Sequence, residues 1–212
     1  MTIIVIGAGH AGVEAALACA RMGIQTQLLT MSRHHIASMP CNPSIGGPAK
    51  GIVVREIDAL GGQMGITADL TAIQFKKLNS NKGPGGQCLR VQSDKIAYSK
   101  MMEDVVHHTQ NLEVIEGIAV QIITKNNQVT GVMCKDGKTY HAKAIVLTTG
   151  TYMSSKILVG NTATSSGPDQ MPTTSDLSQS LRDLGLKTFR LKTGTPARIL
   201  TESIDFSQGL IQ

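Results

Sequence analysis

The chain opens with a continuous apolar run, a glycine turn and a second apolar run. Thr2–Ile6 is β-branched at every position, which is typical of a parallel strand buried on both faces. Small residues then recur at helical spacing as far as Met22-Gly23, and residues 24–30 resume as a strand. The turn between the first strand and the helix reads GxGxxG and consists of Gly7, Ala8, Gly9, His10, Ala11 and Gly12. This unit predicts a dinucleotide diphosphate at the helix N-terminus, because free N–H groups and the helix dipole favour negative charge there.

The end of the second strand departs from the usual dinucleotide-binding pattern. A carboxylate that binds the ribose hydroxyls normally stands there. Here the strand ends in Leu28-Leu29-Thr30, so Thr30 is the candidate ribose contact. Arg33, in the following loop, could instead contact the 2′-phosphate of NADP.

The second half of the chain favours FAD over NADP. Short strands follow residue 111, and Asn126-Asn127 and Asp136-Gly137 are turn signals between them, so residues 119–142 read as a β-meander. Residues 144–147 form another apolar strand that ends in a loop containing Gly150. An NAD(P)-binding Rossmann domain would have a helix where this chain has the meander. We therefore expect an α/β, Rossmann-like FAD-binding domain of the glutathione-reductase type, with Gly150 beside the cofactor.

An α+β segment is inserted at about residues 31–91. We expect a helix over 51–60, a strand over Ala72–Leu78 and a glycine-rich loop after it. A further helix is expected over 90–108, with Val91, Ala97 and Met102 among its apolar positions. The domain organisation predicted is 1–150 for the FAD-binding domain with its insertion, and 151–212 for the start of a second, cleft-lining segment that is truncated.

Composition narrows the function classes. Aromatic residues make up 3% of the 212 residues and Trp is absent, which argues against base stacking on an aromatic platform. The net charge of +5 permits an anionic partner without requiring one. The four cysteines are too far apart for CxxC pairs, His107 and His108 suit a helix C-terminus better than a metal, and no apolar run reaches 18 residues. We expect a cytoplasmic protein without a removable targeting segment, a membrane span or a metal.

The stretch "SMPCNPSIGGPAKG", at 38–51, combines glycines and a lysine with a cysteine between two prolines. A P-loop requires GxxxxGK[ST] after a strand. Here Lys50 follows Ala49, Gly51 stands where Ser or Thr is needed, and no strand is expected directly upstream. The P-loop interpretation is therefore rejected.

Six motifs occur in the order found in one family. "GAGHAGVEAA", "CNPSIGGPAKG", "EIDALGGQMG", "IQFKKLNSNKGP", "LKTGTPARI" and "SIDFS" span nearly the whole chain. The sequence resembles the GidA/MnmG family of tRNA uridine 5-carboxymethylaminomethyl-modifying flavoenzymes. The resemblance implies FAD, NADH and methylenetetrahydrofolate as cofactors and co-substrates, C5 of the wobble uridine as the site modified, tRNA and the GTPase MnmE as partners, and a homodimer. Family members are much longer, so the chain corresponds to an N-terminal portion that is incomplete for catalysis alone.

The resemblance also assigns residues. The glycine turn would hold the FAD diphosphate, Ala119 would meet the adenine end, and Thr174 would supply a further FAD contact. Cys41 matches the family's "CNP" cysteine, whose thiolate could attack C6 of uracil and make C5 nucleophilic; packing beneath the flavin loop is the alternative.

Substrate contacts are expected at three basic positions, Lys50, Arg90 and Lys192. Lys192 belongs to a basic cluster with Arg182, Lys187, Arg190 and Arg198, for which a solvated basic face is equally open. The family's usual "KGPAVR" reads "KGPGGQ" here, so Gln87 replaces an arginine. Two rival functions stay open: another FAD-dependent oxidoreductase that acts on a small molecule, and a non-catalytic fragment that binds RNA or a protein partner.

Overall fold

A four-stranded parallel sheet forms the centre of the molecule. The computed structural model describes residues 1–167, 171–194 and 199–209. The strand order is β10-β1-β2-β6, with every neighbouring pair parallel. The strands are β1 (Thr2–Ile6), β2 (Gln25–Thr30), β6 (Leu112–Glu116) and β10 (Ala144–Leu147). This is the α/β architecture that the sequence predicts, and the boundaries of β1 match the prediction.

Each face of this sheet is covered by a different layer. Ile3 and Val5 point to a hydrophobic cluster shared with helices α1 (His10–Arg21) and α4 (Lys95–His108). Ile4 and Ile6 alternate with them and point to a second cluster on the other face. That cluster is shared with the antiparallel meander β7-β8-β9 and helix α5 (Asp176–Asp183). Because both faces are buried, the strands read as continuous apolar runs.

The predicted meander is confirmed. Its strands are β7 (Ala119–Lys125), β8 (Gln128–Cys134) and β9 (Thr139–His141). Asn126 and Asn127 have φ of 53° and 58° at the first turn, and Gly137 has φ of 84° at the second. Two consecutive positive φ values suit a two-residue hairpin turn, for which Asn is among the residues that tolerate this conformation best.

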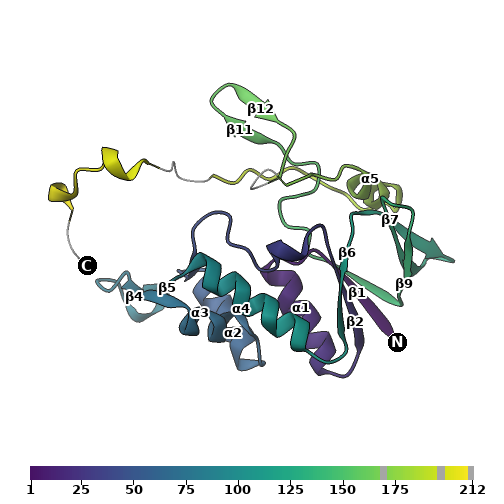
Figure 1. The fold of residues 1–212 in the computed structure, drawn as a ribbon, viewed down its shortest axis with the longest axis horizontal. Helices are drawn as coiled ribbons and strands as arrows, with labels where there is room; N and C mark the ends of the chain where they lie inside the picture. The colour runs from purple at the N-terminus through teal and green to yellow at the C-terminus, as the bar shows by residue number, and fades with distance from the viewer. Residues whose placement is uncertain (168–170, 195–198, 210–212) are drawn as a thin grey trace.

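The insertion contains its own three-stranded antiparallel sheet, of order β3-β5-β4, packed on two helices. It lies at the end of the molecule opposite the meander (Figure 1). Its strands are β3 (Ser44–Gly46), β4 (Ala72–Leu78) and β5 (Cys88–Ser93), its helices are α2 (Lys50–Ala59) and α3 (Met64–Leu70), and short 3-10 turns occupy Arg33–His35 and Pro84–Gly86.

Three details of the insertion correct the sequence-based prediction. The helix expected over 90–108 begins at Lys95, because Asp94 caps it by accepting from Ile96 N and Ala97 N at 2.9 Å. Val91 therefore belongs to β5. A short strand, β3, does precede Lys50, although the sequence mismatch to a P-loop stands. Helix α3 was not predicted.

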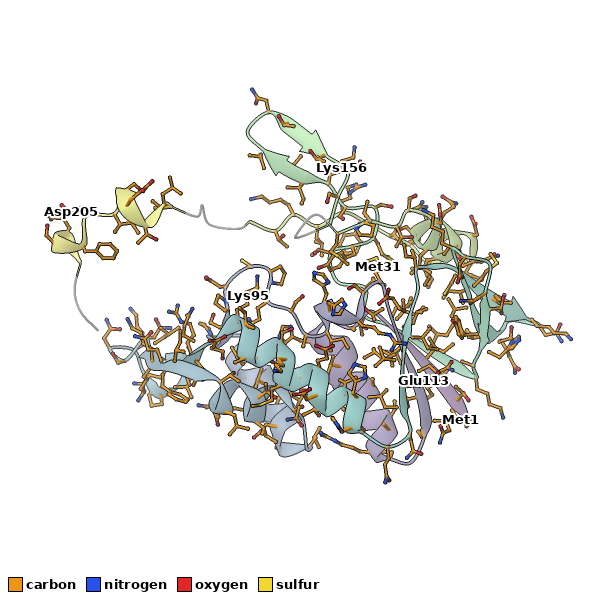
Figure 2. The ribbon with its side chains drawn as sticks, in the orientation of Figure 1. Met1, Met31, Lys95, Glu113, Lys156 and Asp205 are labelled. Carbon is orange, nitrogen blue, oxygen red and sulfur yellow. The ribbon has the colours of Figure 1, made fainter. Side chains whose placement is uncertain are left out.

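The C-terminal part extends away from the body. A hairpin of β11 (Ile157–Val159) and β12 (Thr162–Thr164) projects from it, and residues 187–194 form an exposed arm (Figure 1). Lys156 lies by the hairpin and Asp205 near the far end of the chain, both away from the central sheet (Figure 2). Residues 199–209 include the 3-10 turns Thr201–Ser203 and Phe206–Gln208. In the described part of the chain, no helix has the length and apolar character needed to cross a membrane.

Candidate cofactor-binding site

A cavity of about 440 Å³ opens at the carboxyl ends of β1, β2 and β10. In open α/β sheets, ligands bind at this edge. The walls come from the glycine turn after β1, the loop after β2, the start of β7 and the loop after β10, with Met171, Thr174 and Leu177 closing one side. The lining is mostly apolar with a few hydroxyl groups, as is typical of cofactor sites.

Two glycines of the turn, Gly7 and Gly12, lie against other backbone atoms, and the third, Gly9, is open. Gly7 has φ of 104°, and a Cβ there would lie 2.4 Å from Thr148 O. A Cβ on Gly12 would lie 1.7 Å from Gly7 O, so the helix can approach the turn only without a side chain. A Cβ on Gly9 would meet nothing within 4 Å. The turn therefore leaves a bare concave backbone that faces the cavity at Gly9.

Helix α1 presents its N-terminus to this space. Gly9 is the N-cap residue, no side chain caps the helix, and the first turn carries no acidic residue. The first N–H groups of a helix have no partner within it. Glu14 is turned away, because its carboxylate accepts from Gln63 N at 2.8 Å and Met64 N at 2.6 Å. The arrangement favours an anion at the start of α1.

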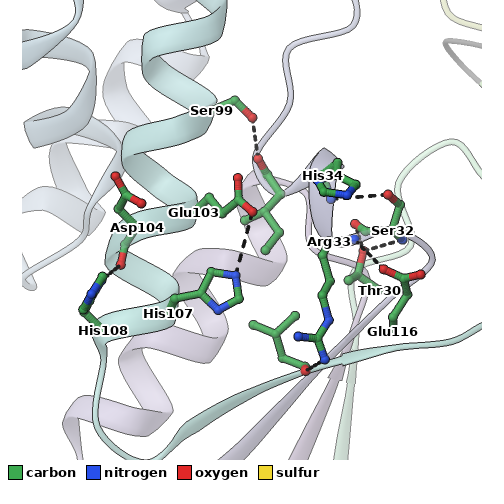
Figure 3. A network of polar contacts seen from close by, with 12 residues as sticks. Thr30, Ser32, Arg33, His34, Ser99, Glu103, Asp104, His107, His108 and Glu116 are labelled. Carbon is green, nitrogen blue, oxygen red and sulfur yellow. Dashed lines mark hydrogen bonds and ion pairs between the residues drawn. The ribbon is translucent and has the colours of Figure 1, made fainter.

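The end of β2 lies in a network of polar contacts (Figure 3). Thr30 Oγ1 donates to Ser32 O at 3.1 Å and accepts from Ser32 N at 3.4 Å, so the hydroxyl is engaged within its own turn. Thr30 is nevertheless among the residues that line the cavity. The Arg33 guanidinium donates to Val114 O at 2.9 Å, and Arg33 N donates to Glu116 Oε2 at 3.0 Å. Arg33 is therefore held on β6, and its position does not support the alternative of a 2′-phosphate contact.

His10 lines the cavity and also contacts Tyr98 of the hydrophobic core. Its ring lies 5.6 Å from that of Tyr98, centroid to centroid. His10 Nε2 and Tyr98 Oη are both buried without a hydrogen-bond partner among the described residues. Burial, and to a smaller extent the positive charge of Lys50, lowers the pKa of His10 to about 4. Burial, and then the negative charge of Glu14, raises the pKa of Tyr98. His10 is therefore neutral at physiological pH.

The structure brings together nearly all the residues predicted to bind the cofactor. Gly12 is the exception: it is buried behind the turn, where it permits the close packing of α1. The residues that line the cavity are Gly7, Ala8, Gly9, His10, Ala11, Thr30, Ala119, Gly150 and Thr174.

The four residues predicted for catalysis or substrate binding lie outside the cavity wall. Cys41 is exposed and next to Pro40, which does line the cavity. Lys50 Nζ donates to Ser44 O at 3.0 Å, Arg90 lies on β5, and Lys192 is exposed on the arm.

Other members of the basic cluster have structural contacts. Arg182 donates to Gln179 Oε1 at 2.7 Å, and Arg190 donates to Ser154 O at 3.0 Å. Arg198 and part of the "LKTGTPARI" motif lie outside the described residues.

Several lining residues were not predicted from the sequence. Among them are Gly117 and Ile118, which follow β6. Tyr152 comes from the loop after β10. The order of the strands could have identified these residues, because loops at the carboxyl ends of neighbouring parallel strands meet at one edge of the sheet.

The predicted absence of a metal centre concerns His107 and His108. His108 Nδ1 lies 2.7 Å from Asp104 O, and His107 Nε2 lies 3.9 Å from Glu103 Oε1 (Figure 3). Within the described ranges, no group of three or more His, Cys, Asp or Glu side chains could hold a metal ion. All four cysteines are free thiols.

Comparison with known proteins agrees with this geometry. The family model of Glucose inhibited division protein A matches residues 2–212. The tRNA uridine 5-carboxymethylaminomethyl modification enzyme MnmG of Acholeplasma laidlawii is 53% identical over 209 residues, and that of Onion yellows phytoplasma is 54% identical over 209 residues. Each alignment covers 99% of this chain and 34% of the relative, so the chain spans about a third of the length of these curated relatives.

Solved structures show the same relationship. GidA of Aquifex aeolicus in its form I crystal superposes with a TM-score of 0.93 at 48% identity, over 98% of this chain and 34% of that one. A GidA-related protein of Thermus thermophilus, 18% identical, shares the fold with a TM-score of 0.64 over 87% of this chain and 68% of that one. The match of the family model over nearly the whole chain shows that the protein belongs to the Glucose inhibited division protein A family.

Proposed function

We propose that the chain binds FAD in the cavity at the carboxyl ends of β1, β2 and β10. The observation that carries the proposal is the bare backbone at Gly9, which faces the cavity beside the uncapped N-terminus of α1. The diphosphate would lie there, held by main-chain N–H groups. Ala119 would meet the adenine end, Thr174 would supply a further FAD contact, Gly150 would lie beside the cofactor, and Thr30 would hydrogen-bond to a ribose hydroxyl. Bound FAD would supply redox chemistry, which this chain's own side chains lack.

We further propose that the chain is the N-terminal, FAD-binding part of a tRNA-modifying flavoenzyme. The support is the identity of more than half to proteins named tRNA uridine 5-carboxymethylaminomethyl modification enzymes, together with the share of their length that is covered. Residues 1–150 would form the FAD domain with its insertion, and 151–212 would begin a second segment. Because about two thirds of the relatives' length lies beyond the matched region, the chain alone would not complete the reaction.

Cys41 is our candidate catalytic residue. Its exposure agrees better with a reactive thiol than with packing beneath the loop. The thiolate would add to C6 of the target uracil, and C5 would then form its new bond to the one-carbon unit derived from methylenetetrahydrofolate. Loss of the C5 proton would re-form the C5–C6 double bond and expel the thiolate. Lys50, Arg90 and Lys192 would contact tRNA. NADH, methylenetetrahydrofolate, the GTPase MnmE, a homodimer and a cytoplasmic location are parts of the proposal that rest on the family resemblance alone.

The test is a titration of the purified chain with FAD, followed by flavin absorbance and fluorescence. Gly9→Val places a side chain in the space of the diphosphate without strain, because Gly9 has φ of −70°. We expect it to weaken FAD binding by at least about 100-fold, because the lost main-chain contacts are charge-assisted. Gly83→Ala, at an exposed turn where a Cβ meets nothing, is the matched control.

Three outcomes would count against the proposal. FAD binding that survives Gly9→Val would place the cofactor elsewhere. A yellow protein that oxidises NADH regardless of tRNA would favour a small-molecule oxidoreductase. A colourless protein that retains tRNA in moderate salt would favour a non-catalytic binding fragment.

A further inference from the structure

The end of β2 lacks the carboxylate that dinucleotide-binding domains normally place there. In such domains, an acidic residue at this point binds the hydroxyl groups of the adenosine ribose. Here Thr30 ends β2, and its hydroxyl both donates to Ser32 O and accepts from Ser32 N. A carboxylate offers about four acceptor positions, whereas this hydroxyl is already engaged in its own turn. Thr30 alone is therefore a weaker ribose contact than the residue it replaces.

The neighbouring strand supplies a carboxylate at the same level of the sheet. Glu116 is the last residue of β6, and the strand register pairs it with Thr30, the last residue of β2. Gly117 N donates to Thr30 O at 2.8 Å, so the two chains stay together beyond the ends of the strands. Paired residues of a parallel sheet point to the same face, so the two side chains start side by side. Glu116 thus stands one strand away from the position of the missing acid.

The carboxylate of Glu116 is held beside the loop that follows β2. Its Oε2 atom accepts from Arg33 N at 3.0 Å (Figure 3). Ser32, which precedes Arg33, and Gly117, which follows Glu116, both line the cofactor cavity. Glu116 is exposed. The carboxylate is therefore positioned at the rim of the cavity, within a loop that is already ordered, and it is accessible to a ligand.

The Glu116 carboxylate also keeps its negative charge and most of its acceptor positions. Arg33 N occupies one acceptor position on Oε2. The Arg33 guanidinium donates to Val114 O instead, and Glu116 forms no ion pair with any residue in the described part of the chain. A carboxylate without a paired cation accepts strongly from hydroxyl groups and repels a phosphate group.

We propose that Glu116 recognises the adenosine ribose of the cofactor, by accepting hydrogen bonds from its free 2′- and 3′-hydroxyl groups alongside Thr30. The inference rests on the proposed binding of FAD and adds to it a specificity-determining residue outside the cavity wall. The same carboxylate would lie against the 2′-phosphate of NADP. It therefore selects a dinucleotide whose adenosine ribose carries no phosphate, as FAD does.

The experiment measures the affinity of the purified chain for two ligands by the change in flavin fluorescence. One ligand is FAD, and the other is its 2′,3′-dideoxyadenosine analogue, which lacks both ribose hydroxyl groups. We expect the native chain to bind the analogue about tenfold more weakly than FAD, because hydrogen bonds to a charged group are lost. Glu116→Ala should bind FAD about tenfold more weakly than the native chain does and should bind the two ligands alike.

Glu113→Ala is the matched control. Glu113 lies on the same strand, is exposed, and accepts from Gln27 Nε2 of β2 at 3.1 Å, but it lies near the start of β6, away from the cavity. This variant should discriminate between the ligands as the native chain does. Glu116→Gln keeps an oxygen that can accept from Arg33 N, so it preserves the loop if Glu116→Ala does not fold. Its preference for FAD should fall to about threefold, because a neutral acceptor bonds about half as strongly.

The comparison of the two ligands separates ribose recognition from support of the loop. If Glu116→Ala weakens the binding of FAD and of the analogue equally, Glu116 only supports the loop after β2, and the proposal is overturned. Loss of discrimination in Glu113→Ala would overturn it as well. A native chain that binds FAD and the analogue equally would overturn it and leave the proposed FAD site intact. A native chain that binds neither ligand would contradict the FAD site itself, and this inference with it.

Discussion

The central sheet and the inserted sheet bury their apolar side chains to different degrees. In β1, all four residues from Ile3 to Ile6 are buried, because helices cover one face and the meander and α5 cover the other. In β4, Ile73 is 68% exposed and Phe75 is 56% exposed, because the inserted sheet is covered by helices over part of one face. Other elements of the described chain therefore cover both faces of β1, whereas the inserted sheet leaves Ile73 and Phe75 exposed.

This difference indicates that the two regions have different roles. Tight backbone contacts concentrate where the cofactor cavity is formed, whereas four of the chain's cations lie in the β4–β5 hairpin of the insertion. Helix α1 connects the regions, since its first turn borders the cavity and its side chains Glu14 and Arg21 bind the chain at 61–64. Three measurements would sharpen or break this comparison.

The largest effect is expected from glycines placed in the two regions. Gly12→Ala should cost at least about 3 kcal/mol of unfolding free energy, because its Cβ would overlap Gly7 O and neither backbone segment can move alone. Gly85→Ala, in the insertion loop, should change stability by less than about 0.5 kcal/mol because its Cβ meets nothing. Urea unfolding followed by circular dichroism measures both. Equal losses would show that the two regions are packed alike.

The second effect is a pH dependence that arises from His10. Its pKa is lowered to about 4 in the folded chain, against about 6.5 when unfolded, so the unfolded state binds more protons between these values. Stability should therefore be unaffected by this group above pH 6.5 and should fall by up to about 3 kcal/mol as the pH drops toward 4. Chemical unfolding at a series of pH values measures the slope. His10→Gln should remove it, and an unchanged slope would assign the dependence to other groups.

The smallest effect concerns the link between the regions. Glu14→Ala leaves Gln63 N and Met64 N without their acceptor, which should cost about 2 kcal/mol. Hydrogen exchange should accelerate first at these two amides and through α3. Glu103→Ala, at an exposed carboxylate of α4 that lies 3.9 Å from His107, should cost less than about 0.5 kcal/mol. If exchange accelerates equally in α1 and α3, the two helices open together, and α1 does not stay folded when its contact with α3 is lost.

The sequence predicted the central sheet well because its signals are local. The β-branched run of Thr2–Ile6 and the paired asparagines at 126 and 127 each specify their own structure through side-chain burial and backbone conformation. Helix α3 was missed because its N-terminal N–H groups are satisfied by Glu14, 49 residues earlier in the chain. The start of α4 was misplaced because Val91 and Ala97 fit helical spacing, while pairing with β3 and β4 makes 88–93 a strand.

The candidate site was predictable to a similar extent. The glycine turn carries its own signature, so its position at the cavity could be expected. Ile118, Tyr152 and Leu177 come from three separate segments, and only the folded topology brings them to one wall. Cys41 and Lys50 lie near that wall in sequence, yet neither lines the cavity. Cys41 is exposed, and Lys50, the first residue of α2, donates to Ser44 O.

The burial of the thiols has a practical consequence. Cys88 and Cys134 are buried and Cys19 is partly covered, so a maleimide reagent under native conditions should react first at Cys41. A fluorophore attached there would sit one residue from Pro40, at the rim of the cavity. The protein thus provides a built-in reporter position, through which ligand entry could be followed in real time without engineering a new attachment point.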